Sequence, residues 1–205
     1  MPIKPFLSVL VITVIVLVGA VQSAMAVDLS NPAFAPEGQN TSVPIGHYQF
    51  CQAAPAECAP NDAAVDAAVL TDSNWRDLVA VNNEVNAAVA PVTDIDQYNV
   101  DEYWTYPQSA GDCEDYALAK RRALMNQGWS ASTLLIAVVR QQNGAGHAVL
   151  LARTDRGDLV LDNQDGDIHV WNETPYTYLK RQSQGDSGAW VDIVDQRPVL
   201  VASVH

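Results

Sequence analysis

The sequence predicts an α+β domain in which a helix that carries a cysteine packs on an antiparallel sheet. Two helical patterns occupy residues 71–127, and five short β-rich runs follow from residue 134 onward. Helical segments that precede a group of closely spaced strands are typical of α+β domains. The short turns between the strands favour antiparallel hairpins.

The first predicted helix begins with Thr71 or Asp72 as its N-cap and ends before Pro91. Apolar residues recur along it at helical spacing and define one buried face: Trp75, Leu78, Val79, Val85 and Val89. Asn82 and Asn86 lie on the same face. Because buried amides need hydrogen-bond partners, we expect both to bind the backbone of a neighbouring loop.

The second predicted helix follows a loop at residues 94–110. It starts near Gly111, runs to about Gln127 and stops at Gly128. Its residues are apolar on most sides, which is typical of a buried helix. Cys113 lies in its first turn.

The predicted strands are short and rich in β-branched residues. They cover residues 134–140, 147–153, 158–162, 168–171 and 190–194. Glycine-containing turn signals at residues 143–146, 155–157 and 165–167 separate the first four.

The N-terminus has the pattern of a secretory signal peptide. Lys4 precedes an apolar run at residues 6–21, and Ala24-Met25-Ala26 closes the segment. A membrane anchor is the alternative, but the run is short for a span of about 20 residues. We expect cleavage after Ala26, an extended leader at residues 27–46, a catalytic domain at residues 47–205 and a periplasmic location.

The net charge limits the classes of molecule that the protein can bind. The chain has 11 Lys and Arg against 24 Asp and Glu, a net charge of −13. Such a field repels phosphate backbones and argues against a nucleic-acid partner, whereas hard cations become plausible partners.

In an oxidising compartment, the closely spaced Cys51 and Cys58 are expected to form a disulfide. Cys113 is then left unpaired, as a reactive thiol would be.

Cys113 has the setting of a nucleophile. The free N–H groups of a helix N-terminus favour a thiolate and could hold an oxyanion. His147 opens an apolar strand after a glycine-containing turn and is the expected base. Asp162 ends the next strand, where a hairpin brings it beside His147, and it would fix the tautomer of the base. His169 is the competing base, but it alternates outward and is expected at the surface.

Three carboxylates flank the nucleophile. Asp112, Glu114 and Asp115 should raise the pKa of the Cys113 thiol, which opposes activation. Acids in a first helical turn also complement the helix dipole, and this is one explanation of them. The other is a bound Ca²⁺, which takes oxygen ligands and would cancel the repulsion.

Three motifs resemble one bacterial family. They are GDCEDYALAK at residues 111–120, GHAVL at residues 146–150 and LDN at residues 161–163. WTYP at residues 104–107 and RQS at residues 181–183 look similar as well. These motifs resemble the bacterial transglutaminase-like cysteine proteinases, the family of periplasmic proteases that release biofilm adhesins. The resemblance covers about residues 44–195.

The resemblance implies a papain-like or transglutaminase-like fold and peptide-bond hydrolysis by Cys113, His147 and Asp162. It also implies calcium dependence through Asp112 and Glu114. By the same resemblance, the substrate is a surface adhesin with an alanine-rich site, and an inner-membrane cyclic-di-GMP receptor is a partner. The sequence thus predicts a calcium-dependent periplasmic cysteine endopeptidase. Two alternatives stay open: a transglutaminase-type acyl transferase, and a catalytically silent calcium-binding envelope module.

Overall fold

The computed structural model describes residues 29–30 and 33–197. The expected signal peptide, residues 1–26, therefore lies outside the described residues. Within them, no helix has the length and apolar character needed to cross a membrane.

A seven-stranded antiparallel sheet forms the centre of the fold, in the order β1-β9-β8-β4-β5-β6-β7. The strands are β1 (Glu37–Thr41), β4 (Leu134–Arg140), β5 (Gly146–Thr154), β6 (Gly157–Leu161), β7 (His169–Val170), β8 (Thr177–Gln182) and β9 (Trp190–Ile193). β2 (Ala90–Pro91) and β3 (Ala110–Gly111) form a separate short parallel pair. Short 3-10 turns occupy Pro55–Cys58, Ala131–Thr133 and Trp171–Glu173.

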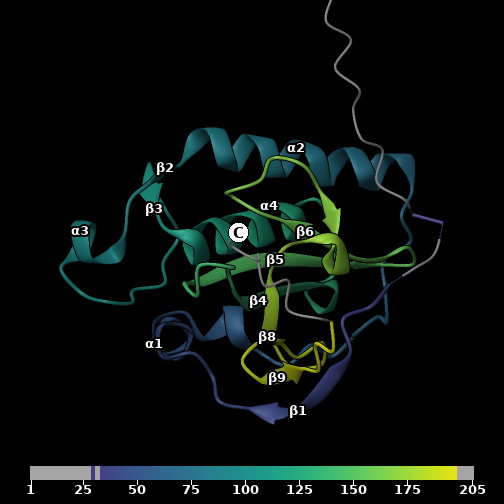
Figure 1. Cartoon of the computed structure of the whole chain (residues 1–205), viewed down its shortest axis with the longest axis horizontal. Helices are drawn as coiled ribbons and strands as arrows, with labels where there is room; N and C mark the ends of the chain where they lie inside the picture. Colours follow the sequence, from purple (N-terminus) through teal and green to yellow (C-terminus); the bar gives the residue numbers. More distant parts are fainter. Residues whose placement is uncertain (1–28, 31–32, 198–205) are drawn as a thin grey trace, which may run out of the picture.

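Two long helices cover one region of this sheet. α4 (Cys113–Asn126) packs on β5 and β4, and α2 (Asp72–Ala88) packs on α4 (Figure 1). α4 is therefore enclosed between a helix and the sheet, which confirms the predicted buried helix. Its buried side chains include charged ones that the mostly apolar pattern did not single out: Glu114, Asp115, Lys120 and Arg121.

The predicted helix starts agree closely with the structure. Thr71 is the N-cap of α2, where its hydroxyl accepts a hydrogen bond from the backbone N–H of Asn74. At the other end of α4, Gly128 adopts a φ of 97°, a left-handed conformation that glycine adopts without strain. The loop predicted at residues 94–110 contains a short helix, α3 (Asp94–Tyr98), which Thr93 caps.

Two strands of the seven-stranded sheet were absent from the sequence prediction, as was the short β2–β3 pair. β8 lies in the middle of the sheet between β4 and β9, yet it reads TYLKRQ. Its polar residues Arg181 and Gln182 are buried with partners from other strands: Arg181 pairs with Glu37 at 2.7 Å, and Gln182 accepts from the backbone of Ile136. Buried polar side chains with such partners hide the apolar alternation on which strand prediction depends.

The other unpredicted strand of this sheet, β1, lies in the segment expected as an extended leader. It pairs with β9, and the backbone N–H just before it, that of Ala35, donates to Asp158 at 2.8 Å. The structure thus packs this part of the segment against the sheet.

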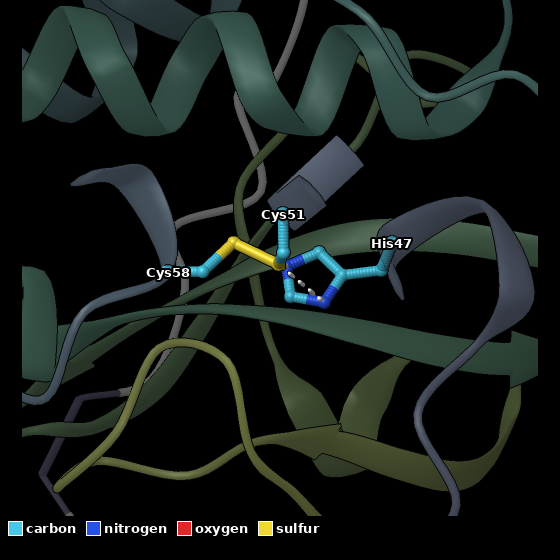
Figure 2. A group of neighbouring side chains, drawn as sticks. All are labelled: His47, Cys51 and Cys58. Atoms are coloured by element: carbon cyan, nitrogen blue, oxygen red, sulfur yellow. Dashed lines mark hydrogen bonds between the residues drawn. A yellow bond between two sulfur atoms is a disulfide. The ribbon is translucent and has the colours of Figure 1, made fainter. Parts of the chain in front are cut away.

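The predicted disulfide between Cys51 and Cys58 is present, with a Cα–Cα distance of 5.6 Å. It lies against His47 in α1 (Ile45–Ala53), whose ring nitrogens are 3.6 to 3.8 Å from the two sulfur atoms (Figure 2). His47 directly follows the expected leader, and its ring is buried and accepts a hydrogen bond from Trp190 Nε1 at 3.1 Å. Burial, and then the charge of Arg121, lowers the pKa of His47 to about 4. It is a neutral packing residue.

Candidate active site

Cys113 occupies the first position of α4, directly after its N-cap Asp112. α4 packs on β5, and the backbone N–H of Ala148 in that strand donates to Cys113 Sγ at 3.3 Å. The thiol is half-buried and is the one free cysteine among the described residues. The sulfur therefore lies at a helix start and accepts one backbone N–H from the adjacent strand, and both features favour a thiolate.

His147 and Asp162 form a buried pair beside this thiol. β5 and β6 are joined in register from Leu150 opposite Leu161 to Thr154 opposite Gly157, so the end of β6 lies near the start of β5. His147 Nε2 is 2.9 Å from Asp162 Oδ1, and both side chains are almost fully buried. The predicted hairpin thus brings the expected base and the expected orienting acid into direct contact.

Asp162 is held in its ionised form by several donors. Burial raises its pKa, but the hydrogen bond and charge of His147, together with the hydrogen bonds from Gln164 and Tyr176, outweigh burial and keep the pKa below its ordinary value. The backbone N–H of Gln164 donates to Oδ1 at 3.0 Å, and the Tyr176 hydroxyl donates to Oδ2. An ionised carboxylate accepts only, so His147 Nε2 carries the proton of this pair.

The loop after Asp162 is tied to α2. Asn86 donates to the carbonyl of Asp162 at 2.8 Å, and Asn82 donates to that of Gly166 at 3.0 Å. The prediction that these two amides bind a loop backbone is confirmed. They fix the segment that carries the acid, and they sit on the buried face of α2 for that reason.

His169 is distant from these contacts. It pairs with Asp165 at 3.1 Å, and its side chain is 38% exposed. It therefore has the surface position expected of it, and it does not contact the thiol.

The thiol and the imidazole make separate contacts in this structure. Cys113 Sγ donates to Glu114 Oε2 at 3.2 Å, while the amide nitrogen of Gln164 is 3.3 Å from His147 Nδ1. Burial first, and then the Glu114 carboxylate, raises the pKa of the Cys113 thiol well above its usual value. The flanking acids thus raise the pKa of the thiol, as the sequence predicts.

An acidic cluster adjoins the thiol. Carboxylate oxygens of Asp94, Asp112 and Glu114 lie within 4.8 Å of one another. Burial and the neighbouring carboxylates raise the pKa of Glu114 to about 8 and that of Asp94 to about 6. One buried oxygen of Asp112, Oδ1, has no hydrogen-bond partner. Closely placed oxygen donors that lack a positive neighbour are the ligand set of a hard divalent cation.

Asp115 is placed differently from the other two flanking acids. Its Oδ1 accepts from the backbone N–H of Thr105 at 2.8 Å, and it is not among the three clustered carboxylates. Burial raises its pKa to about 7. Gly111 is needed beside it, since a Cβ there would lie 2.5 Å from Asp115 Oδ2. Asp94, which joins the cluster in its place, had no signal in the sequence beyond membership of an Asp-rich loop.

These groups open into a cleft of about 700 Å³. Acidic residues line one side of it, and its other walls come from the start of α1 and from β4, β5 and β8. Its lining includes Pro44, Ile45, Ile95, Asp101, Glu102, Trp104, Cys113, Val138, Gly146, His147 and Lys180. A cleft of this volume that reaches Cys113 and His147 can admit part of a peptide chain to the thiol.

Comparisons with known proteins agree with this architecture. The family model of the bacterial transglutaminase-like cysteine proteinases (BTLCP) matches residues 37–198. Calcium-bound LapG of Legionella pneumophila is similar in structure, with 23% identity and a TM-score of 0.51, over 63% of this chain and 75% of that one. The EGTA-treated form aligns with 23% identity and a TM-score of 0.49, over 61% and 69%. No curated protein matches the chain. The predicted α+β, transglutaminase-like fold is confirmed.

Proposed function

The chain belongs to the family of bacterial transglutaminase-like cysteine proteinases, and on that premise we propose that it is a cysteine endopeptidase with Cys113, His147 and Asp162 as its catalytic residues. The observation that carries the assignment is the buried His147–Asp162 pair beside a thiol at a helix N-terminus. Nucleophile, base and orienting acid in this order are the arrangement that acyl transfer through a thioester needs.

The proposed reaction uses each group at a stated atom. His147 Nδ1 takes the proton of Cys113 Sγ, and the thiolate attacks the carbonyl carbon of the scissile peptide bond. The free backbone N–H groups at the start of α4 stabilise the oxyanion. The imidazolium, held by Asp162, then protonates the leaving amine. Water, activated by the neutral imidazole, hydrolyses the thioester and restores the thiol.

We further propose that Asp94, Asp112 and Glu114 hold a Ca²⁺ ion. Support comes from the donor set itself, with three clustered carboxylates and one buried oxygen without a partner. The similar LapG structure is calcium-bound. When bound, the ion would supply positive charge that offsets the repulsion these acids exert on a thiolate. Asp115 would order the neighbouring loop through its bond to Thr105.

The triad is tested by substitution and by labelling. Cys113→Ala and His147→Ala should each lower hydrolysis of an internally quenched peptide pool by at least about a thousandfold. His169→Ala is the matched control and should keep wild-type activity. Iodoacetamide should label Cys113 in the native protein. Full activity in Cys113→Ala would refute the proposal, and an active His147→Ala with an inactive His169→Ala would move the base to His169.

The same peptide pool separates hydrolysis from transfer. With a fluorescent primary amine in excess, a transglutaminase-type enzyme would attach the amine to its acyl substrate, whereas an endopeptidase should release a free carboxyl terminus. Mass spectrometry of the products distinguishes the two. An inactive wild-type protein that still binds Ca²⁺ would instead favour the catalytically silent module.

Location and natural substrate follow from family membership as proposals. We propose export to the periplasm with cleavage after Ala26, and a surface adhesin cut at an alanine-rich site as the substrate. A cyclic-di-GMP receptor in the inner membrane is the proposed regulator. Peptide mapping of protein recovered from the periplasm should give an N-terminus at Val27, and a retained N-terminus would contradict the proposed export.

A further inference from the structure

Gln164 touches both members of the proposed base–acid pair. Its backbone N–H donates to Asp162 Oδ1 at 3.0 Å, and its side-chain nitrogen lies 3.3 Å from His147 Nδ1. The β5–β6 register explains the contact. Leu150 lies opposite Leu161, so the same register continued past the last pair places residue 164 opposite His147.

The direction of this hydrogen bond follows from its neighbours. The ionised Asp162 can only accept, so the proton of a neutral His147 ring sits on Nε2. Nδ1 then carries the lone pair, and the Gln164 amide donates to it. This lone pair is the one that must receive the Cys113 proton in the proposed reaction.

The thiol proton is also engaged elsewhere. Cys113 donates to Glu114 at 3.2 Å, and no hydrogen bond joins it to His147 among the described residues. Both partners of the proton transfer are thus bound to other groups in this structure.

The Gln164 side chain has room to move away from His147. Its backbone is fixed, because Asn86 and Asn82 hold the carbonyls of Asp162 and Gly166 on either side of it. Its side chain is exposed, and a cavity of about 290 Å³ adjoins it, lined also by Asp165, Asp167, His169 and Tyr176. Rotation of the side chain alone can carry the amide from Nδ1 towards that space.

We propose that Gln164 is a positioning residue that caps Nδ1 of His147 in the substrate-free protein, so that the base takes the thiol proton only after the amide has been displaced. The inference rests on the proposed Cys–His–Asp function. It adds a control that keeps the thiol unreactive until a substrate fills the cleft.

The test uses two substitutions with opposite chemistry. Gln164→Leu removes the donor and keeps much of the volume, whereas Gln164→Glu replaces the donor with an acceptor of the same shape. Gln52→Leu, an exposed change on α1, is the matched control. The readouts are the ¹H–¹⁵N spectrum of the His147 ring and the rate of Cys113 alkylation by iodoacetamide, both without substrate and at one calcium concentration.

In Gln164→Leu, the Nδ1 resonance should move towards that of an uncapped nitrogen, and alkylation should speed up roughly 2- to 12-fold, the range that one hydrogen bond supports. In Gln164→Glu, the carboxylate should hold a proton on Nδ1 at a pH where the wild-type ring is neutral. Gln52→Leu should match the wild type in both measurements.

Failure of this inference is separable from failure of the proposed function. If the ring spectrum and the alkylation rate are unchanged in Gln164→Leu while Cys113→Ala is inactive, the proposed role of Gln164 is refuted and the proposed protease function stands. Slower alkylation in Gln164→Leu would also overturn the cap, because it would mean that the amide assists the thiol. A hydrolytically active Cys113→Ala would refute the protease, while the ring spectrum would still report the hydrogen bond.

Discussion

The sharpest quantitative prediction concerns Glu114→Gln in calcium-free protein. Glu114 is 6% exposed, and burial together with the nearby Asp112 carboxylate raises its pKa from 4.5 to about 8. A carboxyl group whose pKa is higher in the folded state than in the unfolded state keeps its proton longer when folded. Its contribution to stability is therefore intact below pH 4.5 and is lost as the pH rises towards 8.

The size of the loss follows from the same two pKa values. Between pH 5 and pH 8 the unfolded chain has released this proton while the folded protein largely retains it, which amounts to about 3 kcal/mol for one group. Glutamine resembles the protonated acid and escapes the loss. In EGTA, Glu114→Gln should match the wild type at pH 5 and exceed it at pH 8, with a melting temperature higher by roughly 6 to 12 °C.

Thermal denaturation at both pH values in EGTA is the assay, with Glu84→Gln on the exposed face of α2 as the control. Saturating Ca²⁺ should remove the advantage of Glu114→Gln, because an ion that binds the folded wild type at 100 times its Kd adds about 2.7 kcal/mol and the variant lacks one ligand. An equal difference in melting temperature at pH 5 and pH 8 would refute the account of the acidic cluster.

Three further outcomes are expected. Replacing Cys51 and Cys58 together with Ala should lower stability by about 2.5 kcal/mol in the chain-entropy relation, a fall in melting temperature of roughly 5 to 10 °C; an unchanged melting temperature would show that the loop is ordered without the bond. Asp162→Asn should leave a folded protein with severely reduced kcat, since His147 loses the partner that fixes its tautomer, and near wild-type kcat would contradict that role. Asn86→Ala should cost about 1 to 2 kcal/mol and reduce kcat several-fold by freeing the loop that carries Asp162; the exposed Asn83→Ala is its control, and equal kcat in the two variants would argue against the tether.

The local pattern of apolar residues was sufficient to predict much of this fold. Helical periodicity located α2 and α4, and apolar runs between glycine turns located β4, β5 and β6. These elements are visible because burial repeats along the chain with the period of the backbone. The cysteine spacing predicted the disulfide for an equally local reason, since a short loop already holds its two ends close together.

The pattern of apolar residues failed to predict the structure where a polar residue is buried against a partner from a distant part of the chain. Arg181 and Gln182 in β8 are the clearest case, because their partners come from β1, β4 and the loop before β9. The burial of His47 has the same cause, since the indole that donates a hydrogen bond to its ring belongs to Trp190, 143 positions away.

The sequence by itself determined the chemical groups: a thiol at a helix start, a histidine at a strand start, an acid at the next strand end and carboxylates around the thiol. Only the tertiary structure decided which of them meet. It brought Asp94 into the acidic cluster, set Asp115 apart from it and placed Gln164 on His147 Nδ1. The physical reason is that short-range periodicity specifies which face of an element is buried, whereas contacts between elements depend on strand register and helix packing, which the whole core fixes at once.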